Sequence, residues 1–137
     1  GAGKGKPDAV IDADCDIWIP AARPDVIDER NVDRLTAKLV VQGANIPITL
    51  GAEKRLAERG ILSVPDFIAN AGGVICGSVE YHGGTQSQAF AVIDEKIRAN
   101  TKAVLDRVGS GGELPRQAAH ALAIERVKDA ERLRRWR

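Results

Sequence analysis

The chain has 137 residues, enough for one hydrophobic core that buries roughly two-thirds of the surface exposed by the unfolded chain. Hydrophobic residues make up 44% and charged residues 28%, which excludes a disordered or fibrous protein. Lys and Arg number 20 against 19 Asp and Glu, and the net charge of +1 gives no general field that would attract nucleic acid or an anionic membrane. Function must therefore come from a specific site.

The first residues, 1–13, are expected to be a flexible leader or a severed loop. Their glycines at positions 1, 3 and 5 do not follow the G-x-G-x-x-G order. Lys6 is followed by Pro7, where a phosphate-binding P-loop has Ser or Thr. The pattern therefore favours a leader or loop over a phosphate site.

Three short apolar runs predict buried strands. They lie within residues 14–22, 37–42 and 60–65, each ends near Pro or Gly, and their spacing is that of strand–helix units. Residues 25–36 predict a weaker helical connection between the first two runs. Alternating strands and helices predict right-handed crossovers, a parallel sheet and the α/β class. Ligands of such sheets bind at the carboxyl ends of the strands.

A helix is predicted between the second and third runs. Thr49 is a good N-cap, the helix runs to Arg59, and Gly60 is its stop. Basic residues gather toward the end of this segment, where they complement the helix dipole. This helix would complete the crossover between the last two strands.

The residues that follow the predicted strands are mostly small or carry an amide. They are Pro20–Ala22, Gly43–Asn45, Pro65–Asp66 and Asn70–Val74. Small side chains let a flat ligand lie against backbone, and an amide fixes the ligand's orientation through hydrogen bonds. We therefore expect Asn45 and Asn70 to lie at one edge of the sheet, beside a ligand.

A nearly bare helix face is predicted after the third strand. Ala69, Gly73 and Gly77 recur at steps of four, and Asn70 is placed to cap this helix. Two explanations stay open for the small residues. They allow either tight packing on a neighbouring element or close approach of a ligand.

The sequence after residue 85 predicts two long helices. The first carries an apolar stripe and ends at the glycine-rich residues 109–112, and the second begins at Pro115. The stripes comprise Phe90, Ile93, Ile97, Thr101, Val104 and Val108, and then Ala123, Val127, Ala130, Leu133 and Trp136. Glu131 and Arg135 are spaced for a surface pair. A three-stranded sheet cannot cover both helices, so part of their apolar surface is expected to meet something outside this chain.

The sequence shows no pattern typical of a metal site, a membrane span or a signal peptide. Cys15 and Cys76 lie far apart in apolar runs, as free thiols in a reducing compartment do. His82 and His120 show no paired ligand spacing. No run reaches the roughly 20 apolar residues of a membrane span, and no signal peptide is evident. We therefore expect a cytoplasmic protein without a metal, a membrane or a nucleic acid as partner.

Three of these segments together resemble a known family. The runs CDIWIPAA at 15–22, QGANIPIT at 42–49 and PDFIANAGGV at 65–74 resemble, in order, the cofactor-domain motifs of the glutamate, leucine, phenylalanine and valine dehydrogenases. The resemblance covers roughly residues 14–137. It implies the second half of a doubly wound, Rossmann-type sheet followed by long helices. It also implies NAD or NADP as cofactor, and oxidative deamination of an L-amino acid to a 2-oxo acid and ammonia.

Carried over residue by residue, the resemblance implies a cofactor site. Ala21 and Ala22 would border the cofactor ribose, Asn45 would lie by the nicotinamide ribose, and Asn70 would bind the nicotinamide carboxamide. The two glycines that follow would open the next helix toward the cofactor. These are Gly72 and Gly73.

The resemblance also implies a substrate site, formed by Val74, Gly77 and Ser78. The string after the second strand favours the glutamate branch of the family. Glutamate enzymes, however, usually place Ser three residues after the Val of the Asn-Ala-Gly-Gly-Val motif. Here Gly77 occupies that position and Ser78 follows, so the choice of amino acid stays open.

The implied organisation has residues 14–85 as the C-terminal half of an NAD(P)-binding domain and residues 86–137 as helices packing toward a substrate domain. The family's catalytic Lys and Asp and its glycine-rich pyrophosphate loop find no match, so we assign no catalytic residue and expect the chain alone to be inactive. The full enzyme is expected to be a homo-oligomer. The alternatives are a stand-alone nucleotide-binding or regulatory module and a helical interaction domain over residues 86–137.

Overall fold

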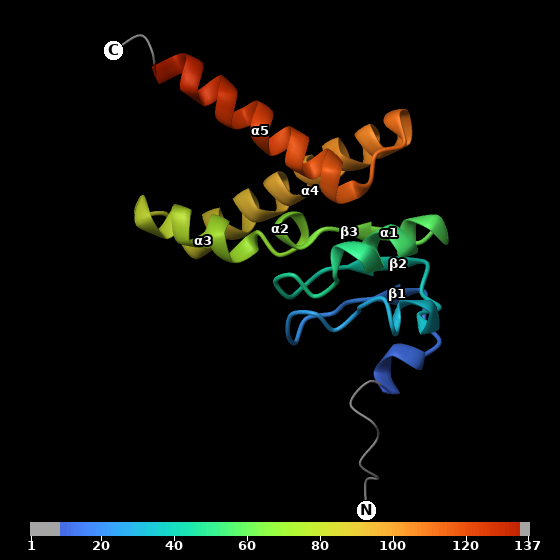
Figure 1. Cartoon of the computed structure of the whole chain (residues 1–137). Coiled ribbons are helices and arrows are strands. Elements are labelled where there is room, and N and C mark those ends of the chain that lie inside the picture. The colour runs from blue at the N-terminus through green and yellow to red at the C-terminus, as the bar shows by residue number, and fades with distance from the viewer. Residues whose placement is uncertain (1–8, 135–137) are drawn as a thin grey trace, which may run out of the picture. The chain divides into compact units, whose positions relative to one another are not determined.

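The structure, a computed structural model, describes residues 9–134 (Figure 1). The chain forms two compact units, of which unit 1 ends at Asn70 and unit 2 begins at Ala71. The glycine-rich start with Lys6, the predicted Glu131–Arg135 pair and Trp136 fall wholly or partly outside the described residues.

Unit 1 contains a parallel three-stranded sheet, as the sequence predicts. Its strands are β1 (Ile17–Trp18), β2 (Leu39–Val41) and β3 (Leu62–Val64), in the order β1-β2-β3. Ile17 pairs with Leu39, and Val40 pairs with Ser63. Each strand is short, and β2 lies in the middle with the fully buried Val40 at its centre. The carboxyl ends of all three strands therefore lie at one edge.

The connection from β1 to β2 is not the predicted helix. Residues 25–36 contain only a short 3₁₀ turn, η2 (Val32–Arg34), and Ile27 forms a parallel bridge with Ile48. The backbone amides of Val26 and Ile27 both donate to the carbonyl of Pro47. This prediction was wrong because the segment satisfies its backbone hydrogen bonds with a distant loop instead of within a helical turn.

Helix α1 (Leu50–Glu58) follows the predicted boundaries closely. The Thr49 hydroxyl accepts a hydrogen bond from the Ala52 amide at 3.2 Å, which satisfies one free donor of the first turn. Gly60, at φ +74°, follows the helix in the left-handed conformation that glycine adopts without strain. Both end signals were therefore predicted correctly.

The core of unit 1 lies around the sheet and the inner face of α1. The 3₁₀ turn η1 (Ala9–Asp12) also contributes to it through Ile11, which lies late in the segment predicted as a leader or loop. Full burial of each large aliphatic side chain contributes about 1.5–3 kcal/mol. The core residues are Ile11, Trp18, Ile27, Val32, Leu35, Ala37, Val40, Ile48, Ala52, Leu56 and Ile61.

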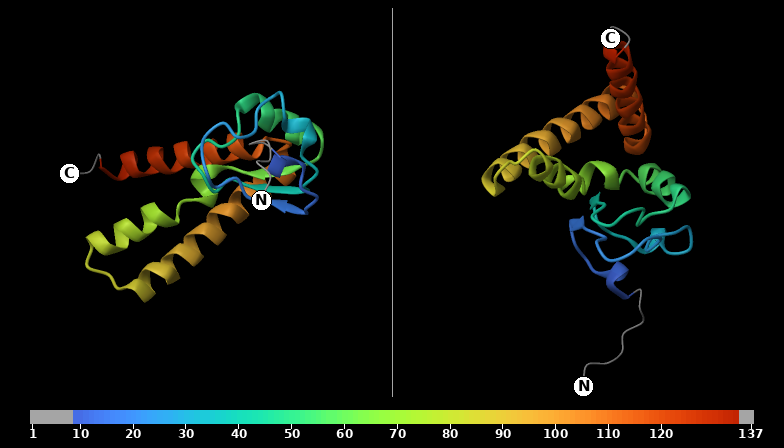
Figure 2. Two further views of the ribbon diagram at one scale, coloured as in Figure 1. Left: turned by 90° about the horizontal axis from the view of Figure 1, so that it is seen from below. Right: turned by 90° about the vertical axis from the view of Figure 1, so that its left-hand side faces the viewer.

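Unit 2 is helical and consists of α3 (Gly72–Tyr81), α4 (Gln86–Gly111) and α5 (Pro115–Arg134). Helices α3 and α4 lie side by side, and α5 packs on α4 (Figure 2). Thr85 and Gln88 form a capping box at the start of α4. Helix α4 continues through residues 109–111, where the glycines predict a loop, and ends only at Gly112 (φ +66°). Consecutive helical hydrogen bonds outweigh the low helix propensity of glycine there.

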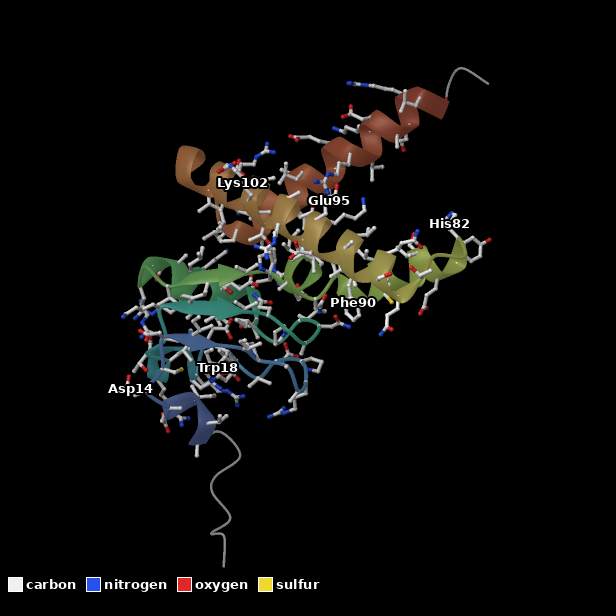
Figure 3. The ribbon with its side chains drawn as sticks, turned by 180° about the vertical axis from the view of Figure 1, so that it is seen from behind. Asp14, Trp18, His82, Phe90, Glu95 and Lys102 are labelled. Atoms are coloured by element: carbon white, nitrogen blue, oxygen red, sulfur yellow. The ribbon has the colours of Figure 1, made fainter. Side chains whose placement is uncertain are left out.

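The predicted apolar stripes are covered unequally. Val104 is buried on α4, whereas Phe90 at the start of the same stripe is 63% exposed and projects from the helix (Figure 3). On α5 the buried residues are Ala118 and Ala119, and the predicted stripe from Ala123 to Leu133 is exposed. The last helix therefore packs through small residues near its start.

Replacing Thr49 with Ala should lower the free energy of unfolding of unit 1 by about 1 kcal/mol, because the first turn of α1 loses its side-chain cap. The measurement is urea unfolding followed by the fluorescence of the buried Trp18, in a Trp136→Phe background. Thr49→Ser is the matched control, since it keeps a hydroxyl acceptor. Equal stability of the Ala and Ser variants would show that the cap contributes nothing.

Candidate functional site

The segments that leave the three strands meet at the carboxyl edge of the sheet in unit 1. The amide of Ala44, after β2, donates to the carbonyl of Pro20, after β1, at 2.8 Å. A Cβ on Gly43 would lie 3.2 Å from Cβ of Ala21, so only a residue without a side chain fits easily between the two segments. Small residues are therefore needed here for close backbone approach.

Two predicted site residues are in direct contact at this edge. The side-chain amide of Asn70 donates to Oδ1 of Asn45 at 2.8 Å and to the carbonyl of Gly43 at 3.4 Å. The sequence predicts that these two asparagines share one edge, and the structure places them together. Their side chains are oriented by each other and by the backbone of the segment that leaves β2, residues 42–46, called the β2 exit below.

Asn70 does not cap the following helix, which corrects the prediction. It ends the short helix α2 (Asp66–Ala69), and the N-cap of α3 is Ala71, without a side-chain hydrogen bond. Ala71 has helical dihedral angles, so the extended backbone that a side-chain cap requires is missing. The Asn70 side chain is consequently free to turn toward β2.

The asparagine pair leaves one acceptor oxygen and one NH₂ group for a ligand. Both N–H groups of Asn70 are directed to acceptors of unit 1, whereas its Oδ1 makes no hydrogen bond with any residue in the range 9–134. Within the same range, Nδ2 of Asn45 also has no partner. A group that both donates and accepts, such as a carboxamide or a sugar hydroxyl, complements this arrangement.

Buried polar side chains fix the start of the segment that leaves β2. Gln42, fully buried after β2, donates through Nε2 to Oε1 of Glu53 on α1 at 2.6 Å and to Oγ of Ser63 on β3 at 3.0 Å. This network joins the central strand to its neighbouring strand and helix. Hydrogen bonding offsets the cost of burying these groups and fixes where the chain leaves β2.

Asp66 is a site residue to which the sequence assigns no role. It is only 6% exposed, and Oδ2 of its carboxylate accepts a hydrogen bond from the backbone amide of Ile46 at 2.9 Å. Ile46 has φ +49°, a left-handed conformation that is uncommon for a β-branched residue. A carboxylate among small residues directly after a buried strand is the sequence signal that could have identified it.

The two alanines differ in how the structure places them. Ala21 lies against Gly43, next to the asparagine pair, and its side chain is exposed. Ala22 is exposed on the same segment, one residue further along. Neither alanine presents bulk that would keep a ligand from the β1 exit.

The remaining predicted residues belong to unit 2. Gly72 and Gly73 form the first turn of α3, and Val74 (81% exposed), Gly77 and Ser78 are exposed along it. A Cβ on Gly73 or Gly77 would meet no atom within 4 Å. Packing within unit 2 therefore does not require these glycines.

The predicted bare face does not extend back to Ala69. That residue lies in α2, and the chain breaks its helical course at Asn70 before α3 begins. The face on α3 consequently contains Gly73 and Gly77 alone. This corrects the predicted three-residue repeat.

Other polar groups at the surface have structural partners. Nδ1 of His82 lies 2.7 Å from the carbonyl of Ser78, at the end of α3 (Figure 3). In residues 9–134 no three His, Cys, Asp or Glu side chains are arranged to hold a metal ion. Over the same range, none of the helices has the length and apolarity needed to cross a membrane.

The carboxylates with a displaced pKa belong to exposed ion pairs. Hydrogen bonds from the Arg30 side chain and backbone hold the pKa of Asp28 below its ordinary value. A hydrogen bond from Arg107 on α4 likewise lowers the pKa of Glu125 on α5. These shifts favour the charged form of the carboxylates and suit ion pairing, not proton transfer near neutral pH.

Comparison with known proteins matches residues 3–135 to the family Glutamate/Leucine/Phenylalanine/Valine dehydrogenase. The chain is 39% identical to a glutamate dehydrogenase of Aeropyrum pernix, over 93% of this chain and 33% of the relative. It is 41% identical to an NADP(+)-dependent glutamate dehydrogenase of Pyrobaculum calidifontis, over 90% and 31%. An NAD-specific glutamate dehydrogenase of Staphylococcus aureus is 36% identical, over 93% and 32%. The chain thus spans about a third of the length of these relatives.

Solved structures share the fold. An L-tryptophan dehydrogenase from Nostoc punctiforme superposes with a TM-score of 0.83 at 27% identity, covering 92% of this chain and 38% of that one. A hetero-hexameric glutamate dehydrogenase from Thermus thermophilus gives 0.82 at 27% identity, covering 96% and 33%. The expected fold class, a Rossmann-type parallel sheet followed by long helices, is confirmed.

Replacing Gly77 with Ala should raise the stability of α3 by about 0.5–1 kcal/mol, because the added methyl group meets open space and alanine favours the helix. Gly84→Ala is the contrasting variant. Its Cβ would lie 3.0 Å from the carbonyl oxygen of Val79, so we expect destabilisation. Thermal unfolding followed by circular dichroism measures both variants. Loss of stability in Gly77→Ala would mean that this face is packed.

Proposed function

Because the chain belongs to the glutamate/leucine/phenylalanine/valine dehydrogenase family, we propose that it provides part of the cofactor and substrate site of an amino-acid dehydrogenase. The proposed reaction is the NAD- or NADP-dependent oxidative deamination of an L-amino acid to a 2-oxo acid and ammonia. The observation that carries the proposal is the asparagine pair at the carboxyl edge of the sheet, where α/β folds bind nucleotides.

The asparagine pair suits the nicotinamide end of the cofactor. Oδ1 of Asn70 would accept a hydrogen bond from the carboxamide NH₂, and Nδ2 of Asn45 would donate to a hydroxyl of the nicotinamide ribose. Ala21 and Ala22 leave room for the ribose beside the β1 exit. When bound, the cofactor accepts a hydride from the substrate, and the role of these residues is to orient its nicotinamide ring.

By resemblance to the family, we propose that residues of α3 in unit 2 also contact the bound molecules. Gly72 and Gly73 would border the cofactor, and Val74, Gly77 and Ser78 would face the side chain of the amino acid. The open space in front of Gly73 and Gly77 supports close approach by a ligand. A Cβ on Gly72 would lie 3.7 Å from the Ile93 side chain, in ordinary van der Waals contact.

Glutamate is the proposed substrate. The three relatives described above are glutamate dehydrogenases, and the string after β2 has the form of the glutamate branch. Gly77 offers no hydroxyl to a substrate carboxylate, so Ser78 is the nearest hydroxyl on α3 that could replace it. Ser78 lies roughly 100° further round the helix, which would require the substrate side chain to approach from a different direction.

The wider organisation follows the same family. We propose that residues 14–85 form the C-terminal half of the cofactor domain and that residues 86–137 pack toward a substrate domain. We also propose that the enzyme is a homo-oligomer; the hetero-hexameric glutamate dehydrogenase from Thermus thermophilus supports an oligomer without indicating identical subunits. A cytoplasmic location agrees with Cys15 and Cys76, both of which are free thiols.

Saturation-transfer NMR of the 137-residue chain with nicotinamide mononucleotide, NAD and NADP tests the cofactor site. We expect saturation of the nicotinamide protons, and about fivefold weaker binding in Asn70→Ala, because losing a hydrogen bond to a ligand typically costs about 1 kcal/mol. Asn100→Ala on α4 is the control and should bind as the parent chain does. Absence of saturation at the nicotinamide protons of the unmodified chain would refute the cofactor site.

The purified chain should show no turnover of glutamate with NAD or NADP. Its three family motifs contain no group assigned to amine activation or proton transfer, which the reaction requires. The measurement is absorbance of the reduced cofactor, with a full-length glutamate dehydrogenase as positive control. Formation of a 2-oxo acid by the purified chain alone would contradict the assignment of no catalytic residue.

A further inference from the structure

We infer that Asp66 is the positioning residue of the asparagine pair, acting through the backbone of Ile46. The inference deepens the proposed nicotinamide site and rests on it for its functional meaning. In unit 1, Asp66 accepts hydrogen bonds from the backbone amides of both Ile46, next to Asn45, and Asn70.

Asp66 contacts the two segments that carry the asparagines. Its carboxylate accepts the amide of Ile46, the residue directly after Asn45, at 2.9 Å. Its backbone carbonyl accepts the amide of Asn70 at 2.7 Å. One residue therefore fixes the β2 exit with its side chain and the end of α2 with its main chain.

The β2 exit needs such a contact because Ile46 has an unfavourable conformation. Its φ of +49° lies in the left-handed region, where a β-branched side chain is crowded. Pro47 follows, and a residue before proline is further biased toward extended backbone. Without a specific partner for its amide, this turn would favour another conformation.

Both polar groups of the Ile46 backbone are held. Its amide donates to the buried Asp66 carboxylate, and its carbonyl accepts from the amide of Asp25 at 3.0 Å. A buried hydrogen bond is stronger than an exposed one, because water does not compete for its donor and acceptor. We therefore attribute the placement of Asn45 beside Asn70 to the Asp66 contact together with the hydrogen bond between the two asparagines.

The experiment follows hydrogen exchange of the residue 46 amide and the side-chain NH₂ resonances of Asn45 and Asn70 in the ¹⁵N-labelled 137-residue chain. In Asp66→Ala we expect exchange to be about fivefold faster, the factor that one hydrogen bond represents, together with displaced NH₂ resonances. Asp66→Asn should stay near the parent chain, because its amide oxygen still accepts a hydrogen bond.

A second substitution distinguishes a positioning role of Asp66 from a general contribution of Asp66 to folding. Glycine adopts positive φ without strain, so adding Ile46→Gly to Asp66→Ala should return the asparagine NH₂ resonances toward their parent values. A role limited to packing or helix α2 would not respond to a change at residue 46. Failure of this rescue overturns the inference, whether or not Asp66→Ala by itself remains folded.

Asp16→Ala is the matched control. Asp16 is an exposed carboxylate that pairs with Lys38 and precedes β1, at the opposite edge of the sheet. It should leave the residue 46 amide and the asparagine resonances unchanged, and a displacement equal to that of Asp66→Ala would overturn the inference. Backbone resonances of Val40 and Leu56 report whether each variant keeps the core of unit 1.

Binding of nicotinamide mononucleotide to the same variants is measured separately. We expect weaker binding in Asp66→Ala and recovery in the double variant. If the asparagine resonances respond as expected but the parent chain binds no mononucleotide, the positioning role stands and the proposed function fails. If the parent chain binds while Asp66→Ala leaves resonances and binding unchanged, the positioning role fails and the proposed function stands.

Discussion

Parallel pairing of β2 with both its neighbours is the constraint on which the candidate site depends. It places the ends of three strands that are distant in sequence at one edge, so that their exits must pass close to one another. Gly43 and Ala21 show the consequence, because a Cβ on the glycine would come within 3.2 Å of the alanine side chain. Small residues at this edge satisfy the backbone and also leave room for a flat ligand.

Two sets of side-chain hydrogen bonds fix the segment that leaves β2. The buried Gln42 joins β2 to Ser63 and Glu53, which fixes the start of this segment. The side-chain amide of Asn70 donates to two acceptors of the same unit, Oδ1 of Asn45 and the carbonyl of Gly43. Preorganisation of this kind reduces the conformational entropy that these side chains lose when a ligand binds.

Unit 2 contributes a different kind of surface. The start of α3 exposes Val74 and the open positions of Gly73 and Gly77, an arrangement suited to contact with an apolar or flat group. Its long helices leave apolar residues such as Phe90 and Val127 exposed. The family relatives are about three times longer than this chain, and such faces agree with a role as part of a larger enzyme.

The elements whose signals are local could be predicted from the sequence. Short apolar runs predicted three strands, Thr49 and Gly60 predicted the ends of α1, and the small residues predicted where the strands end. Which distant groups meet depends on the packing of the whole unit. The Asn70 side chain bonds to a residue 25 positions away instead of capping α3, residues 25–36 form turns and a bridge instead of a helix, and the Asp66 carboxylate accepts the amide of Ile46. Hydrogen-bond partners separated by 20 residues or more are chosen by strand pairing, which local propensity does not encode.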